Sequence, residues 1–153
     1  MKDCFGAVPL WECSKALCDT AMGRRYADTV IINAKLVNVC THEIQENTGV
    51  AITEGRIALI GNVENCIGSD TIVVDAGGAY ISPGFMDGHI HVESSMMSVG
   101  EYAKAIIPHG TTAIFMDPHE MCNVLGLEGV KCMLEDAKRT HLKTMLTVPS
   151  CVP

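Results

Sequence analysis

The chain has 153 residues, 48% of them hydrophobic and 19% charged, a composition typical of a globular protein that excludes disordered and collagen-like classes. The formal net charge is -7 and the 11 basic residues are scattered, so we expect no nucleic-acid partner. No apolar run approaches the roughly 20 residues of a membrane helix, and the chain start has no signal-peptide pattern. We therefore expect a cytoplasmic protein with no membrane partner.

The predicted elements begin with a helical segment in residues 1–25. Apolar residues recur at spacings of three and four from Leu10 through Cys13, Leu17 and Ala21, which predicts a short amphipathic helix ending near Arg24.

Residues 26–83 change to short β-rich runs separated by turn residues. The runs cover residues 29–32, 35–39, 49–53, 56–60, 71–74 and 79–81. Glu54-Gly55 separates two of them by two residues ending in glycine, which predicts a tight hairpin. We expect a small antiparallel sheet here.

From Gly84 onward the predicted elements alternate between strands and helices. Strands are expected at residues 85–92, 112–116 and 142–148, and helices from Ser98 to His109 and over 127–139. Ser98 with Glu101 forms a capping box at the start of the first helix. Such alternation predicts an α/β fold with parallel strands, as in a doubly wound sheet or a (β/α)8 barrel. A complete barrel takes about 250 residues, so residues 84–153 would supply about three of its eight units.

Eight cysteines are present, and no two of them form a C-x-x-C pair. We predict reduced, mostly buried thiols rather than a disulfide framework. The cysteines are Cys4, Cys13, Cys18, Cys40, Cys66, Cys122, Cys132 and Cys151.

Ionisable residues alternate along the strand that begins at Phe85. Asp87, His89, His91 and Glu93 would project from one face of that strand. Charged groups on the inward face of a barrel strand need a compensating partner, and two imidazoles two residues apart can share one divalent cation. We therefore predict His89 and His91 as metal ligands. The alternative is a pair of surface histidines on an edge strand.

A second polar motif, Asp117-Pro118-His119-Glu120, directly follows the second strand, where the active-site loops of such folds lie. Asp117 is a candidate for orienting a ligand imidazole or binding substrate, and His119 and Glu120 are candidates for contacting metal or substrate. The alternative is a plain Asp-Pro turn.

Ser94 and Ser95, in the first loop, are candidate polar contacts for a small ligand, and ordinary loop chemistry is the alternative. His109 is expected to complement the dipole at a helix end, and His42 and His141 are expected to have no role in a site.

The string from Ser82 to His91, Ser-Pro-Gly-Phe-Met-Asp-Gly-His-Ile-His, resembles the signature with which members of the amidohydrolase superfamily enter their metal-binding barrel. Further strings narrow the resemblance to the adenine deaminase family of bacteria and archaea, and residues 27–34 resemble its small β-sandwich-like domain. These further strings cover residues 91–96, 108–112, 117–120, 123–129 and 149–153. The resemblance runs from about residue 16 to the last residue.

The resemblance implies hydrolytic deamination of adenine to hypoxanthine and ammonia, in purine salvage. It implies a two-metal site holding manganese or iron, with zinc as an alternative, in a protein that is a homo-oligomer at full length. His89 and His91 would hold the first metal. Glu93, Asp117, His119 and Glu120 match family positions near the site and are candidates for contact with the substrate or with metal ligands.

The remaining metal ligands and the catalytic base of the family would lie beyond Pro153. We therefore expect the 153-residue chain to be inactive alone. Two alternatives stay open: another cyclic-amide amidohydrolase, such as a dihydroorotase-like enzyme, and a non-catalytic truncated product or module.

Overall fold

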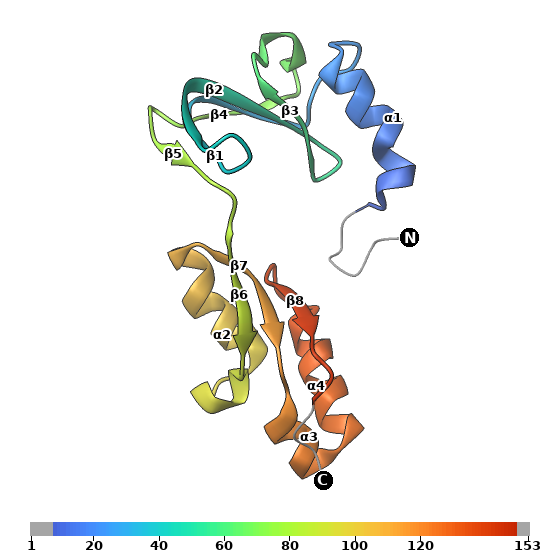
Figure 1. Ribbon diagram of the computed structural model, residues 1–153. Coiled ribbons are helices and arrows are strands. Elements are labelled where there is room, and N and C mark those ends of the chain that lie inside the picture. The colour runs from blue at the N-terminus through green and yellow to red at the C-terminus, as the bar shows by residue number, and fades with distance from the viewer. Residues whose placement is uncertain (1–7, 150–153) are drawn as a thin grey trace. The chain divides into compact units, whose positions relative to one another are not determined.

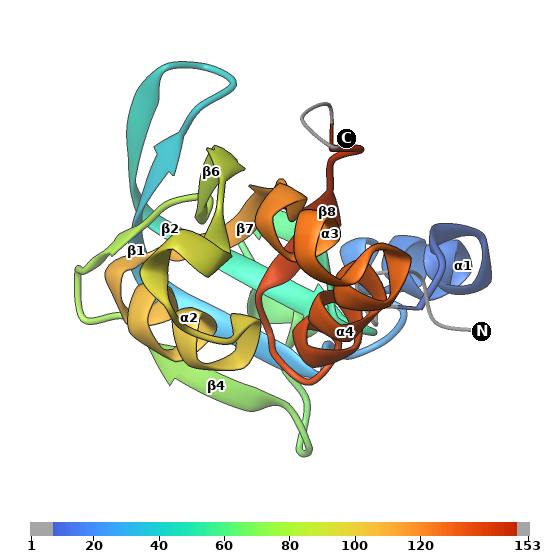
Figure 2. The same ribbon diagram turned by 90° about the horizontal axis from the view of Figure 1, so that it is seen from below.

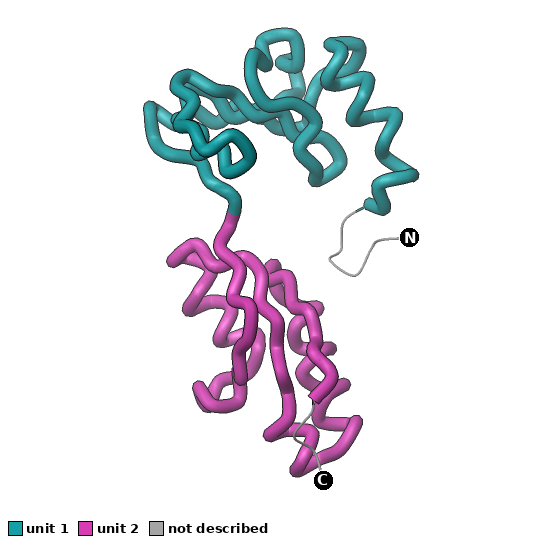
Figure 3. Tube along the Cα trace, viewed as in Figure 1, with its two compact units in different colours: residues 1–83 teal, residues 84–153 magenta. Residues whose placement is uncertain are grey.

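The structure is a computed structural model that describes residues 8–149. Cys4, Cys151 and the last four residues of the 149–153 motif lie outside the described residues. The chain divides between Pro83 and Gly84 into two compact units (Figure 3). Within residues 8–149, no helix has the length and apolar character needed to cross a membrane.

The first unit is a five-stranded sheet with one helix (Figure 1). Its elements are α1 (Leu10–Ala21), β1 (Thr29–Asn38), β2 (Glu43–Thr53), β3 (Arg56–Gly61), the 3-10 helix η1 (Glu64–Cys66), β4 (Ile72–Asp75) and β5 (Tyr80–Ile81). β1, β2 and β3 pair antiparallel as predicted, but β4 and β5 both join β1 in parallel. The expectation of an antiparallel sheet is therefore corrected for β4 and β5, which make the sheet mixed, and the sandwich-like character of the domain stays a prediction.

Asn33 separates the two parallel partners of β1. Its φ of 56° places it in the left-handed region, where asparagine is tolerated, and the resulting bulge joins two runs that the sequence predicted as separate strands. Asn33 Nδ2 donates to Asp75 Oδ1 at 3.0 Å, and the Gly77 N–H donates to the same oxygen at 2.8 Å. The Gly77 N–H, followed by Asn33, lowers the pKa of Asp75 below its usual value.

The predicted hairpin is confirmed. Glu54 and Gly55 have φ values of 54° and 71°, as a type I′ turn requires, and Thr53 pairs with Arg56. Helix α1 ends at Ala21, three residues before the predicted end, and Thr20 on its last turn is fully buried.

Two of the six described cysteines, Cys13 and Cys66, are buried, and Cys122 is half-buried. Cys18, Cys40 and Cys132 are exposed, so the prediction of mostly buried thiols is wrong. Burial raises the pKa of the Cys66 thiol.

The second unit alternates strands with helices, which confirms the α/β prediction. Its elements are β6 (Phe85–Ile90), the 3-10 helix η2 (Val92–Ser95), α2 (Val99–Ile106), the 3-10 helix η3 (Ile107–His109), β7 (Thr111–Met116), α3 (His119–Leu125), α4 (Leu127–Ala137) and β8 (Lys143–Leu146). The strands form a parallel sheet in the order β6-β7-β8. Helices α2 and α4 lie side by side (Figure 2) and pack with β7 around a core that includes Ile114, Met116 and Met133.

Several boundaries in this unit differ from the prediction, among them the end of α2 at Ile106 and the bounds of β8 at Lys143–Leu146. β6 ends at Ile90 rather than Val92, because the chain turns into η2, and α4 ends two residues early at Ala137. The stretch from His119 to Leu125, for which no helix or strand was predicted, is the short helix α3. The predicted cap is confirmed, since the Glu101 N–H donates to Ser98 Oγ at 3.3 Å.

Candidate metal centre

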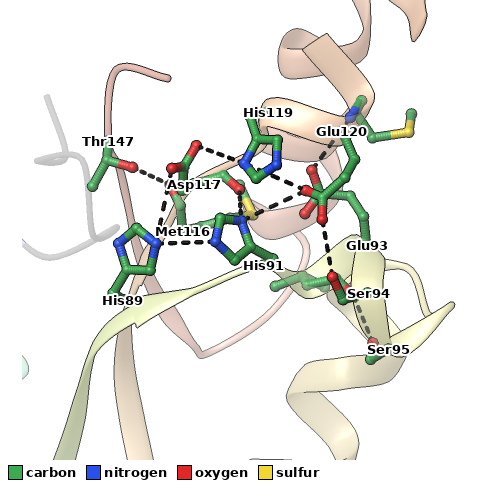
Figure 4. A network of polar contacts seen from close by, with 12 residues as sticks. His89, His91, Glu93, Ser94, Ser95, Met116, Asp117, His119, Glu120 and Thr147 are labelled. Atoms are coloured by element: carbon green, nitrogen blue, oxygen red, sulfur yellow. Dashed lines mark hydrogen bonds and ion pairs between the residues drawn. The ribbon is translucent and has the colours of Figure 1, made fainter. Parts of the chain in front are cut away.

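The carboxyl ends of β6 and β7 bring the two predicted polar motifs together. Ile90 is the register partner of Met116, and the Asp117 N–H donates to the Ile90 carbonyl at 2.9 Å. His91 directly follows Ile90 and Asp117 directly follows Met116, so the two residues meet at one edge of the sheet. Helix α3 starts two residues after Asp117 and adds His119 and Glu120 to the same place (Figure 4).

Two imidazoles and one carboxylate form the first group of candidate ligands. His89 Nε2 and His91 Nε2 are 3.0 Å apart, and His89 Nε2 is 3.9 Å from Asp117 Oδ2. The Asp117 carboxylate is buried, whereas His89 is exposed. The ligand atoms of this group lie within 4.8 Å of one another, as those of a single cation would.

A backbone hydrogen bond fixes the orientation of His91. Its Nδ1 lies 3.0 Å from the Asp117 carbonyl oxygen. A carbonyl can only accept, so Nδ1 donates this hydrogen bond, and Nε2 is the nitrogen that faces His89. Such an outer hydrogen bond is the usual way in which a protein sets the tautomer and angle of a metal-binding histidine.

His91 also belongs to a second group, with His119 and Glu120, whose ligand atoms again lie within 4.8 Å of one another. The His91 and His119 rings meet edge to face with centroids 4.5 Å apart. Glu120 Oε2 lies 3.6 Å from His91 Nδ1 and 3.8 Å from His119 Nδ1. His119 Nδ1 is in turn 3.7 Å from Asp117 Oδ1.

The Glu120 carboxylate is held in its ionised form. Burial raises its pKa, but hydrogen bonds from its own backbone N–H and from Ser94, with smaller effects of His119 and His91, outweigh burial and lower the pKa below its usual value. Ser94 Oγ donates to Glu120 Oε1 at 2.9 Å.

Four buried polar atoms around this site have no hydrogen-bond partner within residues 8–149. They are Glu93 Oε2, Asp117 Oδ1, His119 Nδ1 and Glu120 Oε2. Buried polar atoms in native proteins are nearly always paired, so a gathering of unpaired ones indicates a place where a ligand supplies the missing interaction. Of these atoms, the Asp117 and Glu120 oxygens and the His119 nitrogen belong to residues of the two candidate ligand groups, and the residues present therefore fit a divalent cation.

Not every predicted site residue enters the cluster. Glu93 lies on η2 instead of the strand, and its Oε1 accepts from the Met121 N–H at 3.4 Å, so the prediction that it shares a strand face with His89 is wrong. Asp87 accepts from the His89 N–H at 3.1 Å beneath the cluster. The Ser95 hydroxyl donates to the Val92 carbonyl at 2.6 Å and closes its own turn.

Two contributions were missed in the sequence. One is the Asp117 carbonyl that orients His91, since main-chain groups leave no mark in side-chain patterns. The other is Thr147, whose N–H and hydroxyl both donate to the Met116 carbonyl, at 2.9 and 3.2 Å, and so fix the end of β7 beside Asp117. Thr147 follows the third strand and so lies at the same edge of the sheet, and this position in the sequence could have identified it.

Comparison with known proteins finds a family model that matches the part of the chain that carries this site. Residues 80–153 match the model of the Amidohydrolase family. In a solved structure of molinate hydrolase, 30% of that chain matches 81% of this one with a TM-score of 0.56 at 17% identity, a likeness of fold.

Curated relatives match almost the whole chain. A protein named adenine deaminase from Clostridium botulinum (strain ATCC 19397 / Type A) is 63% identical over 149 residues, which cover 97% of this chain and 25% of the relative. One of the same name from Moorella thermoacetica is 53% identical over 145 residues, covering 95% and 24%. The chain thus spans about a quarter of the length of the curated relatives it matches.

Proposed function

Because the chain belongs to the amidohydrolase family, we propose that its metal centre serves the hydrolytic deamination of adenine in purine salvage. The observation that carries this proposal is 63% identity, over nearly the whole chain, to a protein named adenine deaminase. That alignment spans 97% of the chain, and the clustered residues are a chemically fitting set for a metal-dependent hydrolase.

His89, His91 and Asp117 would hold the cation. The donor set contains imidazoles and a carboxylate without thiolate, which suits manganese or iron(II), with zinc as an alternative. A divalent cation in this position supplies Lewis-acid activation of water at neutral pH.

The chain's own residues would prepare the site in two ways. The Asp117 carbonyl accepts from His91 Nδ1 and so turns His91 Nε2 toward the proposed cation position beside His89. His119 Nδ1 lies 3.7 Å from Asp117 Oδ1 and 3.8 Å from Glu120 Oε2, which places the imidazole beside the proposed cation as a candidate proton carrier.

The proposed reaction adds water to adenine and releases hypoxanthine and ammonia. The exocyclic amine takes up a proton as its bond to the ring breaks, and the oxygen of water remains on the ring. A titratable imidazole at the site, such as His119, is the type of group that carries such a proton.

A polypeptide of residues 1–153 alone is proposed to bind metal without deaminating adenine. It provides three parallel strands, whereas a (β/α)8 site draws its residues from the ends of several strands around the barrel.

The test is a chimaera in which this chain replaces the 149 matched residues of the Clostridium botulinum relative. Ammonia release and hypoxanthine formation from adenine should reach the rate of the unaltered relative within about tenfold. A folded, manganese-loaded chimaera that forms no hypoxanthine would contradict the proposal. Turnover of dihydroorotate instead would favour a different cyclic-amide hydrolase.

A further inference from the structure

Ser94 and Ser95 are adjacent residues of η2 whose hydroxyls have different partners. Ser95 Oγ donates to the Val92 carbonyl and accepts from the Met97 N–H at 3.3 Å, both within its own loop. Ser94 Oγ donates across to Glu120 Oε1, on the helix that follows the neighbouring strand. One hydroxyl therefore closes the turn and the other links it to the metal centre.

The Ser94 hydrogen bond determines which way the Glu120 carboxylate faces. Rotation about the terminal bond of a glutamate exchanges its two oxygens, and the free side chain has broad freedom there. With Oε1 held by Ser94, Oε2 is the oxygen that faces His91 and His119. Oε2 is also the oxygen that is buried and unpaired among the described residues.

Little of the folding free energy depends on this contact. Ser94 is exposed and the Glu120 side chain is 39% exposed, so water can replace the hydrogen bond when it is lost. The exposed position of this hydrogen bond keeps its net effect on stability small, whereas outer partners of metal-site residues have large effects on metal affinity.

We propose that Ser94 is a positioning residue, which orients the Glu120 carboxylate toward the two imidazoles and thereby raises the affinity of the site for a divalent cation. This inference rests on the proposed function, because that proposal supplies the divalent cation at the site. It assigns to Ser94 an action through Glu120, with no contact to the reacting atoms.

The experiment compares Ser94→Ala, Ser94→Thr and the neighbouring control Ser95→Ala in the chimaera. Manganese affinity is measured by competition with a chelating dye, kcat and KM with adenine, and folding by thermal denaturation. Ser94→Ala should weaken manganese binding by about 10- to 100-fold at an unchanged melting temperature. Ser94→Thr keeps the hydroxyl and should restore most of the affinity, and Ser95→Ala should lower the melting temperature while leaving the affinity unchanged.

The outcomes separate this inference from the proposed function. Equal manganese affinity and equal kcat in Ser94→Ala and the parent overturn the positioning role, even where the parent deaminates adenine. An equal loss of affinity in Ser95→Ala also overturns it, since the effect would then belong to the turn. A parent whose manganese affinity falls on Ser94→Ala but which leaves adenine untouched supports positioning and contradicts the proposed function. A parent that binds no manganese contradicts both.

Discussion

The two units of the chain treat buried polar side chains in opposite ways. In the first unit, Thr20 and Thr53 are both fully buried, and their hydroxyls pair at 3.0 Å, while Cys66 Sγ donates to the Thr20 carbonyl at 3.4 Å. In the second unit, buried His119 Nδ1 lies 3.7 Å from Asp117 Oδ1 and 3.8 Å from Glu120 Oε2, and none of these three atoms has a hydrogen-bond partner among the described residues.

Buried polar groups that are hydrogen-bonded to each other help to specify a fold, whereas buried polar groups without a partner indicate a place where a ligand can bind. A satisfied pair such as Thr20 and Thr53 fixes α1 against the hairpin at little cost. An unsatisfied group costs folding free energy, and sites that violate local rules in this way are where function is expected. We therefore expect the binding chemistry in the second unit, where the unpaired groups lie among the candidate metal ligands.

The largest expected effect comes from removing the first pair of ligands. His89→Ala and His91→Ala in the chimaera should each lower kcat/KM for adenine by more than about 100-fold, because losing a ligand costs more than losing an outer partner. Steady-state ammonia release measures this. A loss below tenfold in either variant would place the metal elsewhere.

The hydrogen bond between the Thr20 and Thr53 hydroxyls can be removed by replacing one of the two residues. Thr20→Val should lower the free energy of unfolding by about 1–3 kcal/mol, because the Thr53 hydroxyl stays buried without a partner. The double variant Thr20→Val, Thr53→Val should recover most of that loss. Urea denaturation of the 153-residue chain measures both, and additive losses would show that the hydroxyls do not act as a pair.

Removing an unpaired group of the second unit should have the opposite sign. His119→Leu in metal-free protein should raise the free energy of unfolding by about 1 kcal/mol, since an unsatisfied nitrogen is replaced by an apolar group. The exposed His141→Leu serves as the control and should change stability by less than about 0.5 kcal/mol. A destabilised His119→Leu would mean that His119 is a structural residue.

The smallest effect concerns acid sensitivity in the first unit. The pKa of Asp75 is lowered by Gly77 and Asn33, so its ionised form stabilises the fold above the ordinary aspartate pKa, and this contribution is lost as the pH falls through the lowered value. Asp75→Asn should therefore lose less stability than the parent between about pH 5 and pH 3. Thermal melting across that range measures the difference, and parallel curves for the two proteins would contradict it.

The sequence predicted the existence and order of the strands β6, β7 and β8 and the Ser98 cap, because apolar runs and capping residues act locally, although the bounds of β6 and β8 differ from the prediction. β2 begins six residues before its predicted start, since Glu43 to Thr48 are mostly polar and gain their strand geometry only by pairing with β1. The parallel additions of β4 and β5 are likewise a property of the whole sheet.

Two parts of the site depend on geometry that the sequence does not carry. Alternation along a strand placed Glu93 beside His89, but a 3-10 turn intervenes after His91 and sends Glu93 toward α3. The separate functions of Ser94 and Ser95 follow from which neighbour each hydroxyl reaches, and adjacent identical residues give no means of telling them apart.

The most direct test of a metal centre at the ends of β6 and β7 is manganese titration of the 153-residue chain by calorimetry. Three proteins are compared: the parent, His89→Ala with His91→Ala, and a control with His42→Asn and His141→Ala, in which asparagine tolerates the positive φ of residue 42. Saturable binding in the parent and the control, abolished in the His89 and His91 double variant, is the predicted result. Equal binding in all three proteins, or none in the folded parent, would contradict the account.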